Sequence, residues 1–242
     1  MKVLIISDVH ANLTALEAVL QSAGVVDAVW CLGDLVGYGP DPNECVERIS
    51  SLPNVHCIKG NHDAAVTGEG DVEYFNDEAG SAILITRELM TPANIQYLKG
   101  LPEVLSMEAA TLAHGSLRHP IWEYVIDSDA AQGNFPFFDT PVALVGHTHL
   151  PVAFILDDKS GKVHRRTFKP NFIFPITMKT ILNPGSVGQP RDYDPRASYA
   201  IFNPEAMTWE YHRVDYDFQA VQKRIIKIGL PEKHALRLSE GW

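Results

Sequence analysis

Three short apolar runs within the first 63 residues, each followed directly by a polar cluster, constrain the fold of this chain more than any other feature. The runs are residues 3–6 (VLII), 28–32 (AVWCL) and 55–58 (VHCI). Helical patterns separate them, because Asn12 is typical of an N-cap, Gly24 of a helix end, and residues 42–52 of a second helix. The order strand, helix, strand, helix, strand is typical of a parallel sheet covered by helices.

The rest of the chain changes from helical to strand patterns near Leu101. Residues 76–98 predict a helix with a break at Thr91 and Pro92, and a last helix is expected over residues 216–228. Short strands are expected between them, at residues 103–106, 109–113, 121–125, 142–145, 152–156, 162–168, 178–182, 197–203 and 207–213. No low-complexity linker and no repeat of fixed period divides the chain, so we predict one domain with two packed sheets.

Composition places the chain among ordinary globular proteins, with 45% apolar and 21% charged residues. The apolar run near the N-terminus is too short for a signal peptide and no other run is long enough to cross a membrane, so we expect no membrane span. Cys31, Cys45 and Cys57 form no CxxC pair and are expected to be buried, inert thiols, which fits a cytoplasmic protein. The net charge of −10 disfavours stable binding of duplex nucleic acid, although aspartates around bound cations would count toward that charge.

Polar side chains of metal-ligand type follow the apolar runs. They are Asp8, His10, Asp34, Asn61, His62, Asp63, His114, His147 and His149. The DVH and GHTH motifs each place two of them at positions i and i+2, which would aim both side chains the same way if the strand continued. In open α/β sheets, ligands bind at the carboxyl ends of the strands. Carboxylate, imidazole and amide oxygen together suit Mn²⁺, Fe²⁺ or Zn²⁺ better than Ca²⁺, and the set contains no thiolate for a closed structural zinc site.

Taken in order, DVH, GDLVGYG, GNHD, a lone HG and GHTH resemble the motifs of the calcineurin-like metallophosphoesterase superfamily. The resemblance runs from Asp8 to at least Pro190, and the stretch HGSLRHPIWEY is similar to a bacterial and archaeal, phosphodiesterase-like subgroup. It implies an α/β fold, namely a four-layer α-β-β-α sandwich with two mixed sheets packed face to face and helices outside. It also implies that residues 1–242 form a single metallophosphoesterase domain.

The resemblance implies two divalent metal ions per chain, Mn²⁺, Fe²⁺ or Zn²⁺. One metal is expected at Asp8, His10 and His149, the other at Asn61, His114 and His147, with Asp34 as the bridge. His62 would protonate the leaving oxygen, oriented by Asp63, and would not be a ligand. Two cations roughly 3.5–4 Å apart clamp phosphoryl oxygens and lower the pKa of a bridging water, which becomes a nucleophile near neutral pH.

Three further side chains are candidate substrate contacts, namely Tyr38, Arg118 and Arg191. Tyr38 belongs to GDLVGYG, and Arg118 follows the lone HG motif with His119 beside it. Arg191 follows an NPGS segment and would grip a phosphate oxygen through a bidentate fork, unless it pairs with an aspartate of its own loop, RDYDPR. The aromatic residues of IWEYV alternate as on a strand and are expected to pack against a sheet.

One departure from the protein phosphatases of the superfamily bears on the substrate class. Those enzymes carry GDxVDRG and GNHE, whereas this chain has GDLVGYG and GNHD and lacks the arginine that helps to grip a phosphomonoester dianion. We therefore predict a dinuclear metal-dependent phosphohydrolase, with a phosphodiesterase as the leading hypothesis and a small phosphate ester or nucleotide as the substrate.

Other functions use the same fold. Phosphomonoesters or dinucleoside polyphosphates are alternative substrates, because specificity lies in the loops and not in the metal ligands. A non-catalytic scaffold would be expected to lack ligands or the acid histidine, and a nuclease subunit would carry a basic run; neither pattern is seen. The sequence leaves the oligomeric state open, a homo-oligomer included.

Overall fold

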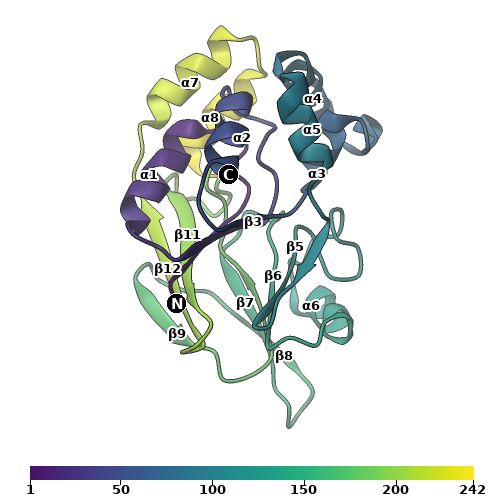
Figure 1. Cartoon of the computed structure of the whole chain (residues 1–242), viewed down its shortest axis with the longest axis vertical. Helices are drawn as coiled ribbons and strands as arrows, with labels where there is room; N and C mark the ends of the chain where they lie inside the picture. Colours follow the sequence, from purple (N-terminus) through teal and green to yellow (C-terminus); the bar gives the residue numbers. More distant parts are fainter.

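Two six-stranded sheets lie at the centre of the protein, for which a computed structural model describes all 242 residues (Figure 1). The first sheet has the order β3 (Val55–Cys57), β2 (Ala28–Cys31), β1 (Val3–Ile6), β11 (Ala197–Asn203), β12 (Thr208–Val214) and β9 (Phe172–Pro175). The second has the order β4 (Val104–Ser106), β5 (Ala110–Ala113), β6 (Val142–Leu144), β10 (Thr180–Asn183), β7 (Val152–Leu156) and β8 (Val163–Arg166). Strands β1, β2 and β3 run parallel, as do β5, β6 and β10, and the remaining pairs are antiparallel.

Helices cover the outer face of each sheet, which confirms the predicted α-β-β-α layering (Figure 1). They are α1 (Leu13–Ala23), α2 (Pro42–Ser50), α3 (Asn61–Thr67), α4 (Asp77–Leu89), α5 (Pro92–Lys99), α6 (Ser128–Asn134), α7 (Phe218–Lys227) and α8 (Glu232–Glu240). Helices α1 and α2 pack on the first sheet, whereas α6 packs on the second. No helix combines the length and the apolar character that crossing a membrane requires.

Strand β1 shows how the sequence divides its side chains between two cores. Val3 and Ile5 point between the sheets, where they share a cluster with Trp209. Leu4 and Ile6 point the other way, into the cluster beneath α1 and α2. All four β1 side chains are buried, as expected for a central strand with both faces covered.

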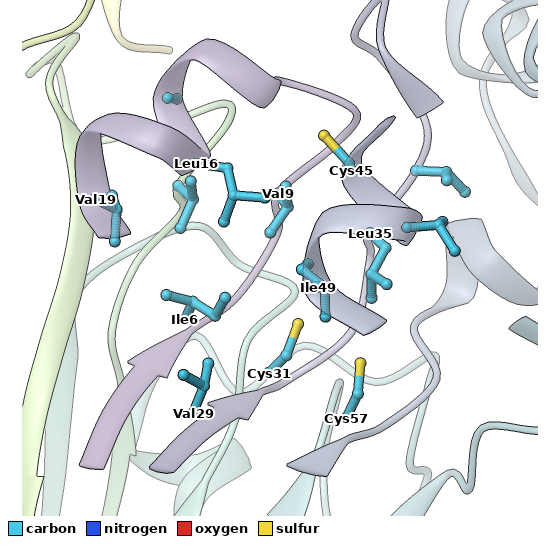
Figure 2. Packing of buried hydrophobic residues seen from close by; sticks show 14 of the residues in the cluster. Ile6, Val9, Leu16, Val19, Val29, Cys31, Leu35, Cys45, Ile49 and Cys57 are labelled. Carbon is cyan, nitrogen blue, oxygen red and sulfur yellow. The ribbon is translucent and has the colours of Figure 1, made fainter. Parts of the chain in front are cut away.

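The cluster beneath α1 and α2 contains all three cysteines (Figure 2). Cys31 and Cys57 face each other across the β2–β3 register, and Cys45 lies on α2. The three thiols are free and buried, which confirms the expectation of small apolar core residues. Burial raises the pKa of Cys45 well above its usual range, so this thiol stays protonated.

The structure departs from the predicted elements in several places, and helices α3 and α6 are two elements that were not expected. Residues 121–125 form a loop and no strand, since hydrogen bonds of Glu123 with Ser116 and Asn134 hold it in place of a ladder. Strand β9 was not expected, because its residues (FIFP) show no alternation of polar and apolar side chains. Helix α8 was not expected either, since its N-cap is Pro231, which offers no side-chain cap.

Candidate metal centre

The seven predicted ligands meet at one end of the two sheets, beyond the carboxyl ends of β1, β2, β3, β5 and β6. They are Asp8, His10, Asp34, Asn61, His114, His147 and His149, and all seven are buried. Asp8 and Asp34 follow two adjacent parallel strands of the first sheet, and His114 and His147 follow two adjacent parallel strands of the second. The packing of one sheet on the other then brings together residues that lie more than a hundred positions apart in the sequence, such as Asp8 and His149.

The backbone turns sharply at five of these residues. Left-handed backbone conformations occur at Asp8 (φ 54°), His10 (φ 47°), Asp34 (φ 54°), His147 (φ 63°) and His149 (φ 61°). Such conformations are uncommon outside glycine and store strain that the surrounding structure must hold. The two histidines of GHTH thus converge through left-handed turns after the strand has ended, and not through the alternation of a continuing strand.

The first ligand group consists of Asp8, His10 and His149, whose donor atoms lie within 4.8 Å of one another. The Nε2 of His149 lies 3.2 Å from the Oδ1 of Asp8 and 3.1 Å from the Nε2 of His10. The Oδ1 of Asp8 is buried and has no hydrogen-bond partner. These three side chains therefore present one carboxylate oxygen and two imidazole nitrogens to a common point.

The second ligand group consists of Asp34, His114 and His147, with Asn61 beside it. The Nε2 of His114 lies 3.2 Å from the Oδ2 of Asp34 and 3.1 Å from the Oδ1 of Asn61. The same Oδ2 of Asp34 lies 3.6 Å from the Nε2 of His10, which belongs to the first group. Asp34 thus stands between the two groups, as a bridging carboxylate must.

The histidine tautomers fit metal binding. The Nδ1 atoms of His10 and His114 lie 3.2 Å and 2.7 Å from backbone carbonyl oxygens, and the Nδ1 of His149 contacts the carbonyl of Gln189. Only an N–H can donate these bonds, so the Nε2 atoms are left as lone-pair donors directed into the site. The Nε2 of His147 and the Oδ2 of Asp34 are buried and make no hydrogen bond, which is the pattern expected of atoms that coordinate a cation.

Electrostatics favour the protonation states that ligands need at Asp8, Asp34 and His147. At His114 burial lowers the pKa but the charge of Asp34 outweighs it and raises the pKa to about 10, so this imidazole has to lose a proton when a cation binds. Burial alone raises the pKa of Asp8, but the imidazoles of His149 and His114 outweigh it, so the pKa falls below its usual range. The pKa of Asp34 is likewise lowered well below its usual range, because His114 and His62 outweigh its burial. Burial lowers the pKa of His147 to about 3. Both carboxylates are therefore ionised at neutral pH and this imidazole is neutral.

Asp63 does not orient His62, contrary to the prediction. Its Oδ1 accepts hydrogen bonds from the backbone N–H groups of Leu35 and Val36, and its Oδ2 accepts those of Asp34 and Gly60. Burial, followed by the negative charge of Asp34, raises the pKa of Asp63 to about 7, against the backbone donors that favour its charged form. Asp63 therefore fixes the loop that carries Asp34.

His62 is positioned by aromatic packing instead. Its ring lies 4.5 Å from that of Tyr38 and 4.9 Å from that of Phe75, in edge-on arrangements. Its Nδ1 is buried without a hydrogen-bond partner. Burial lowers the pKa of His62 to about 4, so the free protein holds it neutral.

Two glycines let the backbone approach the ligands. A Cβ atom on Gly60 would lie 2.1 Å from the Oδ1 of Asp34, and one on Gly146 would lie 2.0 Å from the Oγ of Ser7 and 2.9 Å from the Oδ2 of Asp8. All three distances are shorter than van der Waals contact, so any other residue would displace a proposed ligand or its neighbour.

A cavity of 630 Å³ opens beside the two ligand groups. Its lining residues are Tyr38, Asn61, His62, Tyr74, Phe75, Asn76, Ala79, Trp122, Tyr124, His147, Arg191 and Arg237. Tyr38 and Arg191 thus lie where the sequence predicted them. Arg118 and His119 are not among the lining residues, and the Nε of Arg118 donates to the Glu123 carboxylate at 2.8 Å.

The sequence did not predict that most of the aromatic residues of the cavity lining, or Arg237, would lie at the site. Tyr124 stacks on the ring of His147, with centroids 3.8 Å apart and 15° between the planes. Trp122 lies on the same loop, and the position of both after the lone HG motif was a usable signal. Arg237 comes from α8, where no motif marks it.

Comparison with known proteins relates these features to a family. Residues 1–207 match the model of the calcineurin-like phosphoesterase superfamily domain. The crystal structure of a metallophosphoesterase from Sphaerobacter thermophilus is 45% identical, with a TM-score of 0.92 over 100% of this chain and 99% of that one. An uncharacterized protein of Methanocaldococcus jannaschii is 38% identical over 98% of this chain and 97% of its own length. Phosphodiesterase YfcE of Escherichia coli is 26% identical over 86% of this chain and 90% of its own.

Proposed function

The chain belongs to the calcineurin-like phosphoesterase superfamily and is a metal-dependent phosphoesterase, and on this premise we propose that it is a phosphodiesterase with two divalent cations per chain. The observation that carries the proposal is the pair of ligand groups that meet at Asp34. Asp8, His10 and His149 would hold one cation, and Asn61, His114 and His147 the other. When bound, the cations supply Lewis-acid stabilisation of phosphoryl charge and lower the pKa of an attacking water.

His62 is the proposed general acid. It lines the cavity next to Asn61, and its Nδ1 is free of any protein partner. Since burial keeps the free imidazole neutral, it needs the negative charge of a bound phosphate to raise its pKa and gain the proton. Proton transfer to the leaving oxygen then balances the charge that develops there.

Arg191 is the proposed phosphate contact. Its guanidinium stands over the ring of Tyr38 at 5.8 Å, and its Nε has no partner. It forms no ion pair with Asp192, which is bound by Arg213 instead, and Asp194 pairs with Arg196. The sequence-based alternative, that Arg191 pairs within its own loop, therefore finds no support, and the group is free for a substrate oxygen.

The substrate class is the part of the proposal that needs a direct test. Metal-loaded protein should be assayed with bis-p-nitrophenyl phosphate and p-nitrophenyl phosphate at equal Mn²⁺. The phosphodiesterase proposal expects the higher kcat/KM on the diester. A preference for the monoester would retain the site and reverse the substrate class, whereas no hydrolysis of either would favour a scaffold of the same fold.

A further inference from the structure

The lining of the cavity beside the ligand groups carries positively charged side chains on an acidic protein. The chain has 30 acidic residues and a net charge of −10, yet none of the twelve residues that line this cavity is acidic. Arg191 and Arg237 are its only lining residues with a permanent charge. Such a distribution selects for anions, because low-dielectric walls of one sign focus the field inside a cleft.

The two arginines reach the cavity from separate elements. Arg191 follows the NPGS segment after β10, whereas Arg237 lies on α8, beyond the residues that match the family model. Helix α8 is packed among the other helices above the first sheet (Figure 1). Its His234 is buried with its ring 4.6 Å from that of Tyr38, so α8 is anchored to a residue of the cavity wall.

Neither guanidinium has a carboxylate partner. Five other arginines form ion pairs, namely Arg48, Arg118, Arg196, Arg213 and Arg224. Arg191 donates to the Oε1 of Gln189 at 3.1 Å, and the Nε atoms of Arg191 and Arg237 are buried without partners. Burial lowers the pKa of Arg237, and the charge of Arg191 lowers it further. Two partly desolvated like charges that lack a counter-ion lower stability until an anion binds between them.

Aromatic rings form another part of the cavity lining. Tyr74 is 78% exposed and Trp122 is 37% exposed, and their ring centroids lie 5.6 Å apart. Phe75 lies 5.8 Å from Trp122 in an edge-on arrangement. Large exposed aromatic side chains at a cavity mouth offer a stacking surface for a planar ring.

We propose that Arg237, together with Arg191, forms a subsite for a second phosphate group, so that α8 selects substrates in which a planar aromatic ring is joined to a phosphate beyond the scissile one. The inference rests on the proposed phosphodiesterase function, because it concerns the same cavity. The metal ligands and His62 act on the scissile phosphate, Arg191 contacts both phosphates, and Arg237 contacts only the second. Arg237 then has no role with a simple diester and gains one only when a further anion is present.

The test compares two substrates that differ only in this phosphate: the p-nitrophenyl ester of thymidine 5′-phosphate, with and without a 3′-phosphate. The wild-type protein should favour the 3′-phosphorylated substrate. Arg237→Gln should raise KM for that substrate by about ten- to a hundredfold, the effect of losing one charge-assisted hydrogen bond, and leave its kcat nearly unchanged. The same variant should lower kcat/KM much less for the substrate without the 3′-phosphate, and Arg237→Lys should recover part of the loss.

Lys233→Gln is the matched control, because Lys233 lies on the same helix and pairs with Glu78 outside the lining residues. An equal loss on both substrates, or the same loss in Lys233→Gln, would overturn the subsite. A wild-type protein that hydrolyses both substrates equally would overturn it too, while the phosphodiesterase function would stand.

A binding measurement keeps the subsite testable if no substrate is turned over. Quenching of tryptophan fluorescence should report adenosine 3′,5′-bisphosphate binding to the metal-loaded protein about tenfold or more tightly than adenosine 5′-monophosphate. Arg237→Gln should abolish that difference. Equal affinity for the two nucleotides in the wild-type protein would reject the proposal independently of catalysis.

Discussion

Replacing Asp63 by asparagine should destabilise the protein and weaken metal binding, because Asp63 holds the loop that carries Asp34. Each of its carboxylate oxygens accepts two backbone N–H groups, Leu35 and Val36 at Oδ1 and Asp34 and Gly60 at Oδ2. An amide NH₂ in place of either oxygen leaves two buried donors without an acceptor. At about 1–3 kcal/mol for each such donor, the free energy of unfolding should fall by about 2–6 kcal/mol.

Denaturant unfolding of the Asp63→Asn protein, with and without Mn²⁺, measures this loss. Metal content after dialysis should fall as well, since a displaced Asp34 no longer serves both ligand groups. Asp77→Asn is the control: Asp77 is exposed in the first turn of α4, and its loss should change stability by less than about 0.5 kcal/mol. If Asp63→Asn kept its stability and metal while kcat fell, Asp63 would be acting through His62 and our account of it would be wrong.

Three further substitutions test neighbouring parts of the account. His62→Ala should keep its metal content and lose roughly 10²–10⁴-fold in kcat on a substrate with a poor leaving group, and unchanged turnover there would exclude His62 as the acid. Gly146→Ala should lower both thermal stability and metal content, because its Cβ would lie 2.0 Å from the Oγ of Ser7; wild-type values for both would contradict the close approach. The hydrogen bond from Arg118, opposed by partial burial, lowers the pKa of Glu123 to about 2. The ionised Glu123 carboxylate therefore stabilises the folded protein fully above the pKa that Glu123 has in the unfolded state, and this stabilisation is lost as the pH falls through about 2. Glu123→Gln should therefore destabilise the protein at neutral pH and much less near pH 2 in denaturant titrations, and a pH-independent difference would count against this ion pair.

Most of the proposed ligand set could be predicted because its signal is local. Asp8, Asp34 and Asn61 each follow a short apolar run, and the carboxyl ends of parallel strands meet at one edge of a sheet. The buried cysteines and the break at Thr91, where the side chain caps the next helix, follow from equally local patterns. The resemblance to a known family added the pairing of ligands with metals, which spacing alone does not give.

The rest depends on contacts that local sequence does not encode. Asp63 looked like a partner of the adjacent His62, but the first turn of α3 directs its carboxylate to the backbone of residues 34–36. Trp122 and Tyr124 alternate as in a strand, yet their loop is fixed by Glu123, and both rings turn to the cavity. Arg237 reaches the site only because α8 packs against Tyr38.

Metal stoichiometry distinguishes a two-metal centre bridged by Asp34 from a single site. Wild-type protein and Asp34→Asn should be loaded with Mn²⁺, dialysed and analysed by inductively coupled plasma mass spectrometry. We expect about two Mn²⁺ per wild-type chain and about one or fewer in Asp34→Asn, because the bridging carboxylate serves both cations. A wild-type chain that binds one Mn²⁺, or an Asp34→Asn chain that retains two, would contradict the bridged two-metal centre.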